Sequence, residues 1–242
     1  MFASCLNLKV VRLPESLRTI GHCAFINCSA LVEVNIPSGV IELCERAFFG
    51  CHALKNIVLP QSLQHLPKEL FCDCKSLMSI KLPASIKMIG NGAFTGCSSL
   101  ASANFHELKE LESVGSSAFR NCASLVSADL SELPKLTIIS GYAFKDCTSL
   151  ISFAFPPSVT IIKQQTFYNC SSLAKVKLPA SLQTIESSGF GKCNSNVIVE
   201  VPQSIGDAAR ERIIELGRKK YFNISEERLN EESGHVEAEC TN

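Results

Sequence analysis

Thirteen cysteines stand out in this 242-residue chain as candidate metal ligands, disulfide partners or nucleophiles. Nine of them follow a Phe by three residues, so they hold equivalent positions. Zinc needs ligands that converge tetrahedrally on one point, which a single column of equivalent residues cannot supply. Stacked neighbours would lie about 4.8 Å apart, whereas the Cβ atoms of a disulfide lie about 3.8 Å apart. The nine cysteines are therefore predicted to be reduced and buried, and no metal is expected.

Four further cysteines, Cys23, Cys44, Cys72 and Cys240, lie outside this column. Thiol reactivity depends on exposure and on thiolate character. Cys240 lies in a polar tail, so it is expected to be the most reactive of the thirteen.

Catalytic chemistry finds little support in the sequence. Ser102, His106 and Asp129 are the residue types of a nucleophilic triad, but four residues of extended chain separate Ser102 from His106 by roughly 13 Å. The glycines of residues 90–96 do not match the spacing of a dinucleotide-binding loop, and no βαβ unit surrounds them. We therefore predict that the protein is not an enzyme and binds no cofactor.

The charge balance and the short apolar runs argue against two kinds of interaction, with nucleic acid and with the interior of a membrane. The chain has 23 Lys and Arg against 23 Asp and Glu, and nucleic-acid binding draws its affinity from clustered basic residues. No apolar run approaches the ~20 residues of a membrane span, and the N-terminus has no signal-peptide pattern. Neither nucleic acid nor membrane insertion is expected.

The elements that position these residues come from an internal repeat. Each copy has the Phe and Cys, then an apolar triplet such as Leu77, Ile80 and Leu82, usually a Pro, and then a second apolar pair. The copies recur at intervals of 23 or 25 residues. Their Phe residues are Phe2, Phe25, Phe48, Phe71, Phe94, Phe119, Phe144, Phe167 and Phe190.

Each part of the copy has a local interpretation. Alternation of apolar and variable residues, as in Val11-Arg12-Leu13, predicts a short half-buried strand that the Pro ends. In residues 24–28, Ala24, Phe25 and Cys28 would share one face of a single helical turn. The residue before the Cys is mostly Asn, Asp or Gly, types that tolerate left-handed backbone. Since one copy cannot bury its own apolar stripe, the copies must stack.

The pattern shown best by residues 77–97, Leu-x-x-Ile-x-Leu-Pro-x-Ser-Leu-x-x-Ile-x-x-x-Ala-Phe-x-x-Cys, resembles the BspA-like (treponemal-type) leucine-rich repeat. The resemblance covers about residues 1–202. It implies an extended surface for protein recognition, in several members on the cell exterior and used for adhesion, and it implies no catalytic residues. The expected fold is thus an α/β leucine-rich-repeat solenoid of about nine 23–25-residue rungs, each a short strand plus a helical turn.

Three regions follow from this interpretation. Residues 1–203 form the repeat solenoid, residues 204–222 show helical spacing and are predicted to be a C-terminal capping helix, and residues 223–242 are predicted to be an acidic, disordered tail. The N-terminus has no matching cap, so end-to-end packing with another molecule is possible there. The compartment stays open: abundant thiols favour a reducing interior, and hence the cytoplasm if the chain is complete, whereas the resemblance favours the cell surface if it is a fragment.

The expected binding surface combines the outward residues of two neighbouring strands with a rim. The two 25-residue copies carry their extra residues after these strands, and repeated insertions at one edge of a solenoid often mark a binding rim. The strand face has an alternative interpretation as an ordinary solvated surface. The rim has one as well, in which its leucines only pack against each other. The predicted partner-binding residues are Ser102, Asn104, Glu107, Lys109, Glu110, Ser127, Asp129, Glu132 and Lys135.

Two functions remain. The first is a non-enzymatic interaction scaffold that binds a protein or surface ligand through its concave face and inserted rim. The second is a structural spacer segment of a longer adhesin or receptor. The paired insertions favour the first, and the uncapped N-terminus favours the second.

Overall fold

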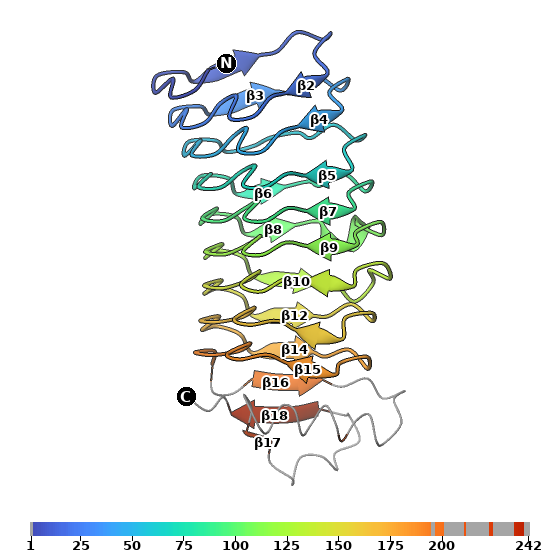
Figure 1. Cartoon of the computed structure of the whole chain (residues 1–242). Coiled ribbons are helices and arrows are strands. Elements are labelled where there is room, and N and C mark those ends of the chain that lie inside the picture. Colours follow the sequence, from blue (N-terminus) through green and yellow to red (C-terminus); the bar gives the residue numbers. More distant parts are fainter. Residues whose placement is uncertain (1, 195–196, 201–210, 212–222, 225–234, 240–242) are drawn as a thin grey trace.

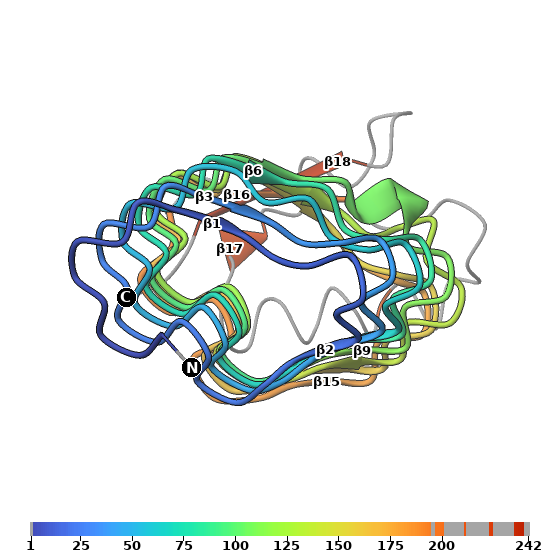
Figure 2. The same ribbon diagram turned by 90° about the horizontal axis from the view of Figure 1, so that it is seen from above.

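A computed structural model describes residues 2–194, 197–200, 211, 223–224 and 235–239 of the chain. Within them the chain winds into a β-solenoid of about eight coils (Figure 1). Viewed along the stack, successive coils superimpose, and short strands lie on the two long sides of an oval outline (Figure 2). We call these sides the first face and the second face.

The first face holds the first strand of each coil, and equivalent residues of neighbouring strands pair in parallel, as in Val10 with Glu33. Its strands are β1 (Val10–Arg12), β3 (Glu33–Asn35), β6 (Ser79–Ile80), β8 (Ser102–Ala103), β10 (Ser127–Asp129), β12 (Ser152–Ala154), β14 (Lys175–Lys177) and β16 (Val197–Glu200). The third coil contributes only an isolated bridge, between Val58 and Lys81. The middle residue of each three-residue strand is buried and its two neighbours point outward, which confirms the predicted alternation.

The second face is built from the second apolar pair of each copy. Its strands are β2 (Thr19–Ile20), β4 (Glu42–Leu43), β5 (His65–Leu66), β7 (Met88–Ile89), β9 (Ser113–Val114), β11 (Ile138–Ile139), β13 (Ile161–Ile162) and β15 (Thr184–Ile185). In each of them the second residue points into the core. The sequence pattern located these apolar pairs but did not identify them as strands.

The core joins the inward apolar residues of both faces to a column of Phe rings at the turn edge, which we define as residues 23–28 and their equivalents in the other coils. Consecutive rings, from Phe2 to Phe190, stack with centroids 5.1–5.7 Å apart and nearly parallel planes. Beside them, each repeat Cys from Cys28 onward donates its thiol hydrogen to the Phe carbonyl of the preceding coil, with Sγ–O distances of 2.8–3.2 Å. Seven of the nine are buried and Cys5 and Cys193 are half-buried, so the prediction of an interior cysteine column is confirmed.

The α/β class predicted for the fold is wrong, because the turn edge is not helical. Each turn contains two left-handed residues, one on either side of the Phe: around Phe25 these are Cys23 (φ 54°) and Asn27 (φ 57°). They interrupt the helical backbone. Backbone N–H groups therefore alternate between two acceptors, the carbonyl three residues earlier in the same turn and a carbonyl of the next coil. Ile26 donates to Cys23, whereas Phe25 donates to Ala47 of the next coil. The position before the Cys was expected to be left-handed, but the position two residues before the Phe carries no common residue type and was missed.

Helical backbone among the described residues is limited to a 3₁₀ turn, η1 (Phe105–Glu107), and the single residue Glu211. The capping helix predicted over residues 204–222 falls on a stretch of which only Glu211 is described, so it lies outside the described residues. In the described repeats, a β-solenoid replaces the predicted combination of strands and helical turns. Within the predicted acidic tail, β17 (Asn223–Ile224) and β18 (His235–Glu239) are strands, and β18 pairs antiparallel with β16 and with β17. The domain limits themselves stay predictions.

The strand ladders are interrupted, most strongly between the second and third coils. There, β4 and β5 do not pair on the second face, and residues 56–58 do not pair with β3 on the first. Pro67 explains part of this, because it stands where Cys44 and Gly90 donate an N–H to the preceding coil and it has no N–H to donate. The turn edge remains joined at the same junction, with Phe25 bonded to Ala47.

Candidate interaction surface

The rim predicted as a binding edge is held together by its own side chains. Lys109 Nζ donates to the Glu132 backbone carbonyl at 2.9 Å, and Lys135 Nζ lies 2.6 Å from Glu110 Oε2. This hydrogen bond from Lys135 lowers the pKa of the Glu110 carboxyl. Beneath these pairs the inserted leucines are fully buried, namely Leu108, Leu111, Leu133 and Leu136. The two insertions therefore form a structural clasp between the fifth and sixth coils.

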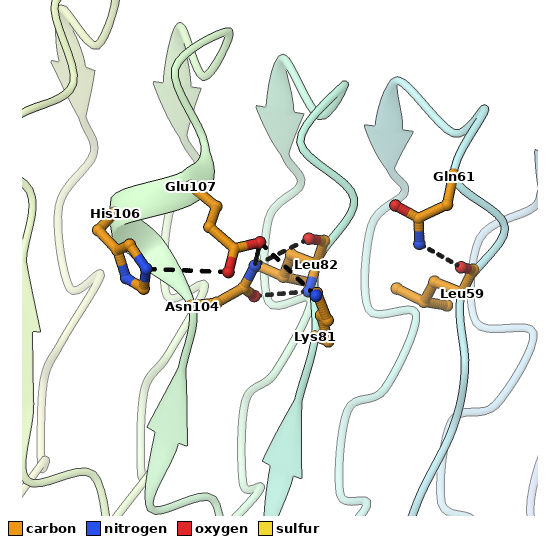
Figure 3. Close-up of polar contacts among 7 residues, drawn as sticks. All are labelled: Leu59, Gln61, Lys81, Leu82, Asn104, His106 and Glu107. Atoms are coloured by element: carbon orange, nitrogen blue, oxygen red, sulfur yellow. Dashed lines mark hydrogen bonds and ion pairs between the residues drawn. The ribbon is translucent and has the colours of Figure 1, made fainter.

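Asn104 and Glu107 also bond within the chain (Figure 3). The Asn104 side chain accepts a hydrogen bond from Leu82 N at 2.7 Å and donates to Leu82 O at 3.1 Å. It thus continues the β6–β8 ladder at the point where the backbone leaves the sheet to form η1. Glu107 Oε2 accepts from Asn104 Nδ2 at 3.0 Å and lies 4.0 Å from Lys81 Nζ. His106 Nε2 lies 3.8 Å from Glu107 Oε1.

Asp129 closes a local turn after β10. Its Oδ1 accepts hydrogen bonds from the hydroxyl and the backbone N–H of Ser131, at 2.6 and 3.0 Å. The bond from the Ser131 hydroxyl is the main cause that lowers the pKa of the Asp129 carboxyl. No hydrogen bond joins Ser102, His106 and Asp129, all of which are described, so the structure does not assemble the triad considered from sequence.

Ser102 and Ser127 are the two predicted residues whose side chains have no hydrogen-bond partner within the described part of the chain. Both side chains are exposed. Ser79 and Ser152 occupy the same position in the adjacent coils, with Ser79 paired to Ser102 and Ser127 paired to Ser152 in the ladders. Four consecutive coils thus present a column of hydroxyl groups on the first face.

An apolar column beside these serines was missed by sequence reasoning. The residue before each serine is Met78, Ala101, Val126 or Ile151, and the exposed fractions of Met78, Val126 and Ile151 are 53%, 44% and 50%. The signal was present in the sequence, since outward apolar residues recur at one repeat position. We call the two columns together the serine strip.

The buried thiols are poor nucleophiles. Burial raises the pKa of Cys51 to about 12, and burial with the nearby Asp73 carboxylate raises that of Cys72 to about 12. A thiol in this state is not a nucleophile at neutral pH. Among the described residues no cluster of His, Cys, Asp and Glu could hold a metal ion, and no helix there is long and apolar enough to span a membrane. Cys240 lies outside the described residues.

Comparison with known proteins places this architecture in a family. A family model described as BspA type leucine rich repeat region (6 copies) matches residues 1–126 and 106–212. The leucine rich repeat protein TpLRR of T. pallidum is similar in structure, with a TM-score of 0.63 and 25% sequence identity over 87% of this chain and 84% of that one.

A leucine rich cell surface protein of Faecalibacterium prausnitzii shares the fold, with a TM-score of 0.60 and 22% identity over 82% of this chain and 62% of that one. A search of curated proteins gave no significant match. The family model covers well over half of the sequence and agrees with the stacked Phe and Cys columns. The chain therefore belongs to the BspA-type leucine-rich repeat family.

Proposed function

We propose that this protein is a non-enzymatic interaction scaffold that binds a partner protein through the serine strip of its first face. The observation that carries the proposal is the combination of free hydroxyls and exposed apolar side chains over four consecutive coils. Contiguous exposed apolar surface of this kind is typical of protein-binding sites. Membership of a leucine-rich repeat family supports a scaffold role in general terms.

The predicted site changes accordingly. Ser102 and Ser127 remain the proposed contact residues, joined by Val126 and Ile151. The remaining predicted residues, Asn104, Glu107, Lys109, Glu110, Asp129, Glu132 and Lys135, have partners within the chain, which supports a positioning role for them. In this proposal the clasp sets the shape of the strip, and the strip makes the contacts.

Site-specific photocrosslinking tests the proposal. A photoreactive amino acid at Ser102 or Ser127 should trap a partner, whereas the same group at Lys75, an exposed residue that directly follows the turn edge, should not. Val126→Arg should then weaken binding of that purified partner about tenfold or more, because it places a charge in the apolar column. Thr184→Arg, an exposed position on the second face, is the matched control.

Equal crosslinking at Lys75 and at the strip would contradict the proposal. It would favour the alternative function, a spacer segment within a longer surface protein, in which no single patch of the first face is specialised for contact. Undiminished binding by Val126→Arg would exclude the apolar column as the contact surface.

A further inference from the structure

The second face carries a trough that runs from the second coil to the sixth. It encloses 920 Å³ and is bordered by the outward residues of β4, β5, β7, β9 and β11. Four junctions at about 4.8 Å give it a length of roughly 19 Å, which an extended peptide of about six residues would span. None of the residues predicted from sequence as a binding site lines it.

Two glycines allow neighbouring coils to approach closely along the trough. Gly90 and Gly115 stand where the chain leaves β7 and β9, and both line the hollow. A Cβ added at Gly90 would lie 2.7 Å from Leu66 O, and one added at Gly115 would lie 2.7 Å from Asn91 N. Both contacts are with backbone, which cannot swing aside as a side chain would. The close approach of neighbouring coils therefore excludes a side chain at these two positions, whereas Pro67 and Ser140 hold the equivalent positions of the third and sixth coils.

Apolar side chains are exposed within the trough. Ile41, Met88 and Ile138 have exposed fractions of 63%, 41% and 52%. They come from the second, fourth and sixth coils, so they are distributed along the full length of the trough. Outside it, the equivalent outward positions of the first, seventh and eighth coils are Thr19, Ile161 and Thr184, of which only Ile161 is apolar, and its side chain is half-buried. The most exposed large apolar side chains of the described second face thus lie where the surface is hollow.

The end of the trough at the second coil is acidic. Glu42 and Glu45 both line it, and neither forms an ion pair with a cation of the described chain. The nearest polar contact is from Thr19 Oγ1 to Glu42 Oε2, at 3.5 Å. Lys68, the lysine of the lining, lies 3.8 Å from Glu69 Oε1, and Arg46 also bonds to Glu69. Burial, together with the charges of Glu42 and Glu45, raises the pKa of the Cys44 thiol between them.

We propose that the trough binds a peptide segment of a partner protein that is apolar along its length and carries Lys or Arg at the end above Glu42 and Glu45. This inference rests on the proposed role in protein binding and assigns it a second surface. The apolar residues of the segment cover Met88 and Ile138, while the basic end supplies the charge that the two carboxylates lack. Because the glutamates are exposed, their contribution falls as salt is added.

Fluorescence anisotropy with synthetic peptides tests the charge requirement. The probes are labelled Leu-Ala-Ile-Ala-Leu peptides that end in Lys-Lys, Ser-Ser or Glu-Glu. The Lys-Lys peptide should bind about tenfold more tightly than the Glu-Glu peptide at low salt, and the difference should shrink in 0.5 M salt. In the double variant Glu42→Lys/Glu45→Lys the order should reverse. An unchanged order in that variant, or no binding by any of the three peptides, would overturn the proposal.

A second pair of variants tests the apolar floor. Met88→Ser/Ile138→Ser should weaken the Lys-Lys peptide about tenfold, whereas Val126→Ser/Ile151→Ser, with similar exposure on the first face, should leave it unchanged. If only the first-face variant loses the peptide, the trough is excluded while protein binding through the serine strip stands. If sedimentation shows a dimer that Met88→Ser/Ile138→Ser dissociates, the occupant is a second copy of this chain and the peptide proposal fails.

Discussion

The turn edge and the strand faces are made by the same repeat, yet they differ in regularity. At the turn edge every described junction has the Phe stack, the thiol bond and the hydrogen bonds between coils. On the faces the ladders break at several junctions, and both break between the second and third coils. The difference shows that cohesion of the stack resides at one edge, which leaves the two faces free to carry varied outward residues, a hollow and an inserted clasp.

The largest expected effect comes from removing one ring of the Phe column. Phe94 is fully buried between Phe71 and Phe119, so Phe94→Ala should lower the free energy of unfolding by roughly 3–5 kcal/mol. Phe2 is 45% exposed and stacks only on Phe25, so Phe2→Ala should cost much less. Urea denaturation of both variants measures this, and equal losses would refute the view that the column holds the coils together.

Alkaline pH should weaken the turn edge through its thiols. Burial raises the pKa of Cys51 from 9.0 to about 12, so above pH 9 the unfolded chain releases this proton while the folded chain keeps it. Stability is therefore full below pH 9 and is lost as pH rises toward 12, at about 1.4 kcal/mol per pH unit for one thiol. Unfolding measured from pH 8 to 10.5 should show a shallower slope in Cys51→Ala. An identical slope in Cys51→Ala and the original protein would mean that Cys51 ionises as readily in the folded chain as in the unfolded chain.

Left-handed positions should matter at the turn edge and not on the faces. Asn121 has φ of 58° and its side chain forms no hydrogen bond, so Asn121→Ala should cost about 1 kcal/mol through backbone strain alone. Asn35, an exposed outward residue of β3 without positive φ, is the matched control, and Asn35→Ala should change thermal stability little. A larger loss for Asn35→Ala would place the backbone constraint on the first face instead.

The smallest effect is expected at the clasp. The pair formed by Glu110 and Lys135 is solvent-exposed, and exposed ion pairs contribute little to stability. Exchanging the two charges, Glu110→Lys with Lys135→Glu, should leave the melting temperature within a degree or two of the original in physiological salt. Replacement of the buried Leu108 by Ala, in contrast, should lower it clearly. If the charge exchange were the more damaging change, the surface pairs and not the leucines would hold the two insertions.

The repeat made the stacked architecture and its interior predictable. Phe spacing and the period-2 alternation around Val11 were sufficient to place the core column and the outward residues of the first face. The turn was misjudged because Ala24, Phe25 and Cys28 suit one face of a helix equally well. The helix is excluded by the left-handed residue two positions before the Phe. Cys23, Arg46 and Tyr142 hold that position and share no side-chain property, so the sequence does not reveal it.

The candidate surfaces were less predictable, because side-chain pairing between coils is not encoded by spacing alone. The side chains of Ser102 and Ser127 form no hydrogen bond within the described part of the chain. The Asn104 side chain, in contrast, forms two hydrogen bonds with the Leu82 backbone where the ladder between the backbones ends. The trough is lined by Gly90 and Gly115, whose close approach to the backbone of the preceding coil is a tertiary property that becomes visible only once the coils are stacked. From sequence alone these glycines are indistinguishable from turn residues.

The backbone hydrogen bonds between coils at the turn edge all run in one sense, since the N–H groups of Phe25, Phe48 and Phe71 each donate to the coil that follows, whereas the thiols donate to the coil before. Peptide dipoles aligned in this way add, as they do along an α-helix. The turn edge is therefore an electrical dipole, with its positive pole toward the later coils and its negative pole toward the earlier ones. The dipoles of two such turn edges that meet end to end attract when the later end of one faces the earlier end of the other, and repel when like ends meet.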